Sequence, residues 1–282
     1  MKDFLGIESP YIDYNSARAV VIPVPFEHTT SYGQGTKLGP QAIIDASAYV
    51  ELYDEEYDRE MYRSGVHTAP ALHFRNNPED DFDTITREFR RVLADGKFPV
   101  GLGGEHSVSY PIYRAFHEKY DHLSVLQFDA HSDLRESYEG TPYSHASVMR
   151  RIYDLNKDIV QVGIRSQCIE EAQFIKENKI NTFYAHSLRK SGLSDDIIDR
   201  LNENVFITID VDYFDPSIMP STGTPEPGGF LWYETVEFLT HVFKQKNVVG
   251  FDVVELSPKA GVIHPDFFAA KLIYKMLTLK FL

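Results

Sequence analysis

Six uninterrupted apolar runs, separated by stretches of helical periodicity, constrain the fold of this chain more than any other feature. Continuous apolarity is typical of parallel strands that are covered on both faces. The runs lie at 19–23, 98–102, 123–128, 159–164, 205–209 and 248–254, and the helical patterns at 108–119, 169–178, 195–202, 233–244 and 265–279. Such alternation predicts parallel βαβ units. We therefore expect an α/β protein with one domain over residues 1–282, a length that a single large α/β domain often reaches.

Three of these runs end in residues that commonly bind metals. One continues as Gly-Gly-Glu-His over 103–106, another as Asp-Ala-His-Ser-Asp over 129–133, and a third as Asp-Val-Asp over 210–212. In parallel sheets, ligands gather beyond the carboxyl ends of the strands. The chain must turn directly after Asp129, because a straight strand rising about 3.3 Å per residue would hold Asp129 and Asp133 roughly 13 Å apart. The candidate metal ligands are His106, Asp129, His131, Asp133, Asp210 and Asp212.

The charges of this set suit two divalent cations. Four aspartates and one bridging hydroxide balance two such ions to within a single negative charge, so the site favours a cationic substrate. The set contains no cysteine, and its oxygen-rich donors favour a hard ion such as manganese. Two ions about 3.5–4 Å apart lower the pKa of a bridging water and supply hydroxide at neutral pH. The expected chemistry is hydrolysis.

Four segments resemble the characteristic sequences of the ureohydrolases, the arginase and agmatinase family, and are most similar to those of agmatinases. They are 103–107, 128–133, 210–216 and 222–229, which reads Thr-Gly-Thr-Pro-Glu-Pro-Gly-Gly. The match is collinear and extends from about residue 22 to the C-terminus. The resemblance implies a three-layer α/β/α fold with a mostly parallel central sheet, a pair of manganese ions, release of urea from a guanidinium compound, and a homo-oligomer made of one trimer or two.

The resemblance also assigns roles to individual residues. One manganese ion would be held by His106, Asp129, Asp133 and Asp210, and the other by His131, Asp129, Asp210 and Asp212. Asp129 and Asp210 would then bridge the ions. Glu255 matches the glutamate that holds the substrate guanidinium; its two oxygens suit a planar cation and would aim the central carbon at the hydroxide.

Two further residues are expected at the site from the resemblance. His145 matches an active-site histidine that delivers a proton to the leaving amine or orients the substrate, since imidazole titrates near neutral pH. Many agmatinases continue with His-Gly-Thr, whereas this chain has Ala146 and Ser147 after the histidine. Thr224 is expected to hydrogen-bond the substrate or the hydroxide, although its loop is rich in residues that shape turns.

The segment 134–140 bears on the choice of substrate. It lacks the small polar residues with which arginases hold the α-carboxylate and α-amino group, which favours agmatine or aminopropylagmatine. Glu136 and Glu139 are predicted to receive the distal ammonium groups. Arg135 leaves two alternatives open: it binds a carboxylate, which would favour guanidinobutyrate or arginine, or it points outward and pairs with an acid. A metallohydrolase with another amidine or phosphoester substrate and a non-catalytic polyamine-binding homologue are the other functions considered.

Composition narrows the function further. With 28 basic and 42 acidic residues, the formal net charge of −14 argues against nucleic acid as a partner. No apolar run approaches the roughly 20 residues that cross a bilayer, and the first residues lack the pattern of a secretion signal. A cytoplasmic enzyme without a membrane partner is expected. The single cysteine, Cys168, falls at the start of a predicted helix with no neighbouring histidine, which disfavours cysteine-dependent deiminases and amidinotransferases.

Overall fold

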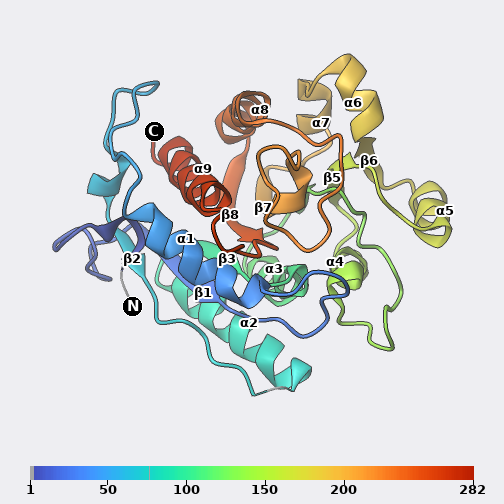
Figure 1. The fold of residues 1–282 in the computed structure, drawn as a ribbon, viewed down its shortest axis with the longest axis horizontal. Helices are drawn as coiled ribbons and strands as arrows, with labels where there is room; N and C mark the ends of the chain where they lie inside the picture. Colours follow the sequence, from blue (N-terminus) through green and yellow to red (C-terminus); the bar gives the residue numbers. More distant parts are fainter. Residues whose placement is uncertain (1–2, 76) are drawn as a thin grey trace.

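The computed structural model describes residues 3–75 and 77–282, and all of its named strands belong to one parallel sheet (Figure 1). The strands are β1 (Ala19–Val24), β2 (Val66–Thr68), β3 (Phe98–Gly103), β4 (Leu123–Phe128), β5 (Ile159–Ile164), β6 (Asn181–Tyr184), β7 (Asn204–Asp210) and β8 (Asn247–Val254). Their order across the sheet is β2-β1-β3-β8-β7-β4-β5-β6, and every neighbouring pair is parallel. Residues 1, 2 and 76 of the predicted domain lie outside the described residues.

Helices cover both faces of the sheet. They are α1 (Gly39–Ser47), α2 (Pro78–Ala94), α3 (Ser109–His117), α4 (Val148–Leu155), α5 (Ile169–Asn178), α6 (Ala185–Ser191), α7 (Asp195–Ile198), α8 (Trp232–Gln245) and α9 (His264–Lys280). Buried side chains of α1, α8 and α9 pack with one face of the strands, and those of α2, α3 and α4 pack with the other. Figure 1 shows the sheet between these two layers. The predicted three-layer α/β/α fold is confirmed.

The six predicted strands agree with the structure to within two residues at each end, but several elements were not predicted from the sequence. Strands β2 and β6 lie at the edges of the sheet, where strands need less apolar cover. β2 is only three residues long and β6 is only partly buried, so neither forms a long apolar run in the sequence. Helix α2 begins with a proline followed by three acidic residues, which is a typical helix start. The predicted helix over 195–202 ends at residue 198. Within the part of the chain that the structure describes, no helix has the length and apolar character needed to cross a membrane.

The four central strands β3, β8, β7 and β4 end side by side at one edge of the sheet. Gly103 and Gly104, at the end of β3, allow neighbouring segments to pack closely against this strand end. A Cβ atom on Gly103 would lie 2.5 Å from Val254 of β8, and one on Gly104 would lie 1.9 Å from the carbonyl oxygen of Phe26. The absence of side chains at the end of β3 therefore lets the next residues reach the end of β8.

Candidate active site and metal centre

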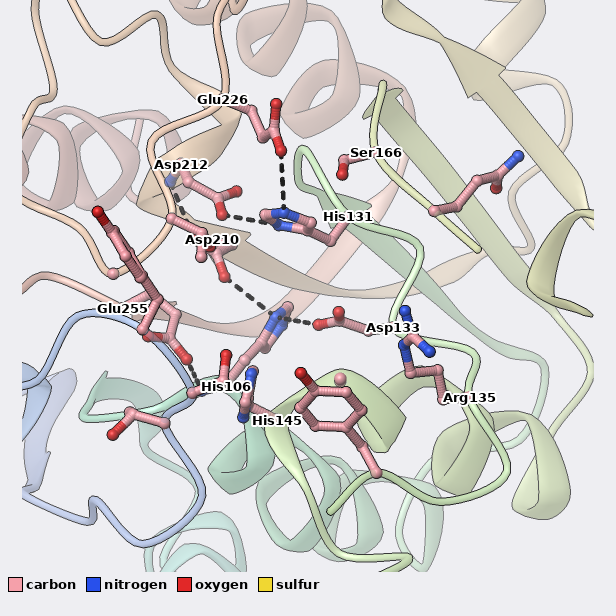
Figure 2. A pocket seen from close by; sticks show the side chains of 18 of the residues that line it. His106, His131, Asp133, Arg135, His145, Ser166, Asp210, Asp212, Glu226 and Glu255 are labelled. Carbon is pink, nitrogen blue, oxygen red and sulfur yellow. Dashed lines mark hydrogen bonds and ion pairs between the residues drawn. The ribbon is translucent and has the colours of Figure 1, made fainter. Parts of the chain in front are cut away.

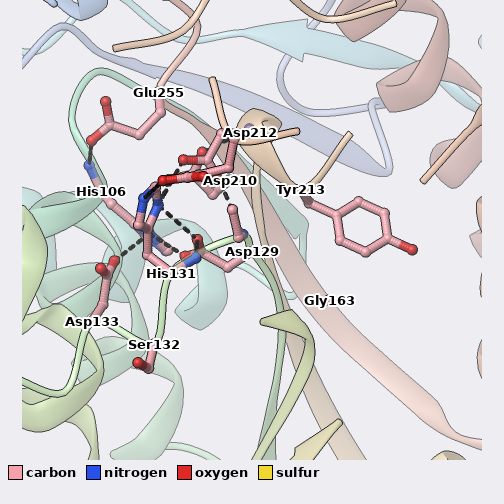
Figure 3. Close-up of polar contacts among 12 residues, drawn as sticks. His106, Asp129, His131, Ser132, Asp133, Gly163, Asp210, Asp212, Tyr213 and Glu255 are labelled. Atoms are coloured by element: carbon pink, nitrogen blue, oxygen red, sulfur yellow. Dashed lines mark hydrogen bonds and ion pairs between the residues drawn. The ribbon is translucent and has the colours of Figure 1, made fainter. Parts of the chain in front are cut away.

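His106 stands at the centre of a group of buried carboxylates beyond the ends of β3, β4 and β7 (Figure 3). Its Nδ1 atom lies 3.1 Å from Asp129 Oδ2, 3.0 Å from Asp133 Oδ2 and 3.3 Å from Asp210 Oδ2. One ring nitrogen donates at most one hydrogen bond, and among the described residues Nδ1 has no partner of good hydrogen-bond geometry. Three oxygens and one nitrogen that converge in this way suit a shared cation.

A second group surrounds His131 and shares Asp129 with the first. The His131 Nδ1 atom lies 2.9 Å from Asp212 Oδ2 and 3.7 Å from Asp129 Oδ1. Ligand atoms of His106, Asp129 and Asp210 lie within 4.8 Å of one another, and so do those of Asp129, His131 and Asp212. The structure thus brings all six sequence-predicted ligands together as two adjoining groups.

Short-range hydrogen bonds produce the turns that aim these side chains. Asp129 Oδ1 accepts a 2.6 Å bond from the backbone N–H of His131, and Asp210 Oδ1 accepts a 2.9 Å bond from that of Asp212. Asp133 has a φ of 53°, a left-handed conformation that is strained for a non-glycine residue and that concentrates at functional sites. The predicted turn after Asp129 is therefore confirmed, because Asp129 and Asp133 both approach His106.

The electrostatics of the two groups favour bound cations. Burial and the neighbouring charge of Asp129 raise the pKa of Asp133 to about 7, and burial together with Asp212 raises the pKa of Asp210 well above its ordinary value. Burial opposes the charge of His106, but the carboxylates around it outweigh burial and raise its pKa. Buried carboxylates this close together repel one another unless positive charge lies beside them, so the donor set fits two divalent ions.

Glu255 follows the end of β8 and reaches the same centre. Its Oε1 atom accepts a 2.6 Å hydrogen bond from the backbone N–H of His106, and its own N–H donates to the carbonyl of Gly104 at 2.8 Å. Glu255 also has a left-handed φ, of 65°. Burial raises the pKa of this carboxyl to about 8. Figure 2 shows the side chain at the cavity wall, beside the metal-ligand groups.

His145 lines the cavity and is held by a chain of polar groups. Its Nδ1 lies 3.2 Å from Thr29 Oγ1, which also accepts a 3.0 Å bond from the His145 backbone N–H. The Thr29 hydroxyl donates to Glu105 Oε1 at 2.8 Å, and the fully buried Glu105 carboxylate also accepts the backbone N–H groups of His28 and Thr29 at 2.6 Å each. Burial lowers the pKa of His145 and so favours the neutral imidazole. The positioning role of Glu105 was not predicted from the sequence.

A cavity of about 440 Å³ opens above the metal-ligand groups, and Thr224 and Arg135 are among the residues that line it. Neither Glu136 nor Glu139, which were predicted to receive the distal ammonium groups, is among the described residues that line this cavity. The Glu136 carboxylate is 68% exposed and instead pairs with Arg150, whose Nη2 lies 2.6 Å from its Oε2.

Arg135 matches neither of its two expected arrangements in full, because it lies at the cavity wall and also has an acid beside it. Its Nε lies 3.9 Å from Glu171 Oε2, and its guanidinium carbon lies 5.1 Å from the centre of the Tyr138 ring. The arginine therefore has a neighbouring acid and an aromatic face beside it. This arrangement leaves it less suited to hold a substrate carboxylate.

A model of the arginase family matches residues 17–278 of the chain. The chain belongs to the arginase family. Among curated relatives, the N(1)-aminopropylagmatine ureohydrolase of Synechocystis is 39% identical, with 98% of this chain and 93% of that protein aligned. The agmatinase of Pyrococcus horikoshii is 34% identical, with 96% and 95% aligned. The solved agmatine ureohydrolase of Thermoplasma volcanium is 32% identical, covers 99% of this chain and 94% of its own, and superposes with a TM-score of 0.90. This protein is thus an arginase-family ureohydrolase, which is a hydrolase.

Several residues that line the cavity of this ureohydrolase were not predicted as site residues. They include Cys168, Glu171 and Glu226. Cys168 caps the N-terminus of α5 as its position suggested, but it also faces the cavity. Glu226 lies inside the 222–229 segment that carried the family resemblance, so that segment already contained a signal for an acidic cavity wall.

Proposed function

We propose that this ureohydrolase releases urea from agmatine or from agmatine that carries an aminopropyl group. The observation that carries the proposal is the buried Glu255 carboxylate, fixed by the His106 backbone N–H at 2.6 Å directly beside the metal-ligand groups. A carboxylate there suits a guanidinium ion, and the wider cavity is acidic. The names of the relatives, N(1)-aminopropylagmatine ureohydrolase and agmatinase, support a substrate with an amine at its far end.

The proposed cofactor is a pair of manganese ions. Oxygen-rich donors without cysteine favour a hard cation of this kind. The residues proposed to hold the two ions are His106, Asp129, Asp133 and Asp210 for one, and His131, Asp129, Asp210 and Asp212 for the other. When bound, such a pair lowers the pKa of a shared water and supplies hydroxide at neutral pH.

The side chains around this centre bind and orient the substrate. Glu255 pairs with two N–H groups of the planar guanidinium and holds its central carbon beside the ligand groups. Burial lowers the pKa of His145 and favours the neutral imidazole, whose Nε2 atom, opposite the Thr29 contact, is proposed either to orient the substrate or to take up a proton first and then pass it to the leaving amine. The Thr224 hydroxyl is proposed as a further hydrogen-bonding group at the cavity wall.

One observation favours a second substrate class. Arg135 lines the cavity, and a cation there would attract the carboxylate of guanidinobutyrate or arginine. The neighbouring Glu171 carboxylate, 3.9 Å from Arg135, weakens that attraction. For this reason the amine-bearing substrates remain the main proposal.

Substrate preference tests the proposal directly. The purified enzyme, loaded with manganese, is assayed for urea release from agmatine, aminopropylagmatine, guanidinobutyrate and arginine, and the kcat/KM values are compared. We expect either amine-bearing compound to exceed both carboxylate-bearing compounds. A clear preference for guanidinobutyrate or arginine would contradict the proposal. Manganese binding without urea release from any of the four would support the non-catalytic alternative.

The assembly of the enzyme is a separate proposal. The family resemblance implies a trimer or a pair of trimers, so we expect a mass three or six times that of the chain. Light scattering at micromolar concentration measures this mass. A value close to 32.3 kDa would show a monomer under those conditions.

A further inference from the structure

Glu226 occupies the part of the cavity wall beside His131, on the loop that follows β7 (Figure 2). We propose that Glu226 determines substrate specificity by receiving the distal ammonium group of the substrate. This inference rests on the proposed function and adds the residue that selects for an amine at the far end. Glu226 takes the role that the sequence alone suggested for Glu136 and Glu139.

The backbone that carries Glu226 is fixed to the metal-ligand segment. Nη2 of Arg165 donates to the carbonyl oxygen of Glu226 at 2.9 Å and to that of Asp212 at 2.6 Å, and Nε donates to that of Pro227 at 3.1 Å. The Asp215 carboxylate accepts the N–H groups of the next two residues, 228 and 229, at 3.1 Å each. One guanidinium therefore ties the Glu226 loop to Asp212, so the carboxylate needs little reorganisation to bind a cation.

The Glu226 carboxylate is also open to a ligand. Its side chain is 36% exposed, and Oε1 lies 3.8 Å from His131 Nε2, which is too long for a hydrogen bond. The Glu226 carboxylate accepts no hydrogen bond from the described residues, 3–75 and 77–282. Glu171 differs, because it accepts the backbone N–H groups of Leu134 at 2.9 Å and Cys168 at 2.8 Å and also faces Arg135.

Among the described acids of the outer cavity, Glu226 is thus the one with neither a hydrogen bond nor an arginine or lysine partner, and its ion-pair neighbour is His131 at 3.8 Å. Arg135 and Glu171 offset each other, while the metal ligands and Glu255 serve the guanidinium end. Agmatine carries its ammonium four methylene groups from the guanidinium. In aminopropylagmatine the same nitrogen is a secondary ammonium with two N–H donors, so one carboxylate serves both compounds. Guanidinobutyrate places a carboxylate at that end and is repelled by Glu226, which adds specificity by an unfavourable contact.

The test compares Glu226→Gln with the wild-type enzyme on agmatine and on butylguanidine, which has the same chain but no ammonium. We expect kcat/KM for agmatine to fall about tenfold, the scale of one charge-assisted contact, with the change mainly in KM. Butylguanidine hydrolysis and manganese content should not change. Glu226→Asp, which keeps the charge, should retain most of the preference for agmatine.

Equal losses on agmatine and butylguanidine, or loss of manganese, would overturn the inference, because Glu226 would then act through the ligand His131. An unchanged kcat/KM for agmatine would also overturn it. Glu139→Gln is the matched control, an exposed glutamate outside the cavity; a selective loss in that variant instead would return the role to the loop at 134–140. A wild-type enzyme that releases no urea from agmatine or aminopropylagmatine refutes the proposed function itself, which is a different result.

Discussion

Replacing Glu255 by glutamine tests whether a buried carboxylate, separate from the metal ligands, holds the guanidinium. The side chain is 7% exposed, and its Oε1 accepts the 2.6 Å bond from the His106 N–H. Glutamine has nearly the same shape and keeps a carbonyl oxygen for that bond. The substitution therefore removes the negative charge while leaving the position of His106 and the metal-ligand groups in place.

The expected loss follows from the type of contact that is removed. A hydrogen bond to a charged group contributes about 1.5–3 kcal/mol, and about 1.4 kcal/mol corresponds to tenfold in rate, so kcat/KM should fall roughly ten- to a hundredfold. Burial raises the pKa of Glu255 to about 8, and divalent cations beside it would favour the ionised form that binds a guanidinium. The loss should therefore appear at neutral pH in the manganese-loaded enzyme.

Steady-state urea release and elemental analysis of the same preparations decide the outcome. Glu255→Gln should retain the manganese content of the wild-type enzyme, and Glu237→Gln, on the exposed face of α8, should behave as wild type in both measurements. Wild-type kinetics in Glu255→Gln would remove this residue from substrate binding. A loss of manganese would show that Glu255 supports the metal centre instead.

Three further predictions follow from the site and the core. Asp129→Ala should lose both manganese ions by elemental analysis because Asp129 belongs to both ligand groups, whereas Asp212→Ala should mainly lose one; full metal retention in Asp129→Ala would contradict the assignment. His145→Ala should keep its metals and turn over more slowly. Because burial lowers the pKa of His145, its protonation should reduce the wild-type rate only below pH 6.5, and this decline should be missing from the pH profile of the variant. Lys275→Ala removes the ammonium that lies 2.6 Å from the buried Asp54 carboxylate, so urea denaturation should show a free energy of unfolding lower by about 3 kcal/mol. Burial opposes the Lys275 charge, but its carboxylate partners outweigh burial and raise its pKa, so this stabilisation is fully present below the ordinary pKa of 10.5 and is lost as pH rises through the higher folded-state value; an unchanged free energy of unfolding in the variant would refute this account.

The metal-ligand residues could be predicted from the sequence because they lie at or just beyond the ends of apolar strands. Asp129 directly follows β4, Asp210 is the last residue of β7, and His106 comes three residues after the end of β3; parallel strands place these carboxyl ends together. The order of the strands was not inferred from these runs. Only the structure shows that β8, which precedes Glu255, lies between β3 and β7.

The outer wall of the cavity was harder to predict because it depends on contacts between loops and helices. Helix α4 was not predicted, and it carries Arg150, which pairs with Glu136 on the surface. The Glu226 position depends on Arg165, whose guanidinium joins segments far apart in the sequence. A sequence pattern gives the charge of such residues, but the direction of each side chain follows from these long-range contacts.

The central claim is manganese-dependent release of urea from an agmatine-type compound, and product analysis tests it most directly. The metal-free enzyme is reconstituted with manganese and incubated with agmatine or aminopropylagmatine, and urea and the polyamine product are quantified in the same sample. The account predicts equimolar urea and amine, with no product before manganese is added. Two bound manganese ions without turnover of either compound, or release of ammonia in place of urea, would contradict it.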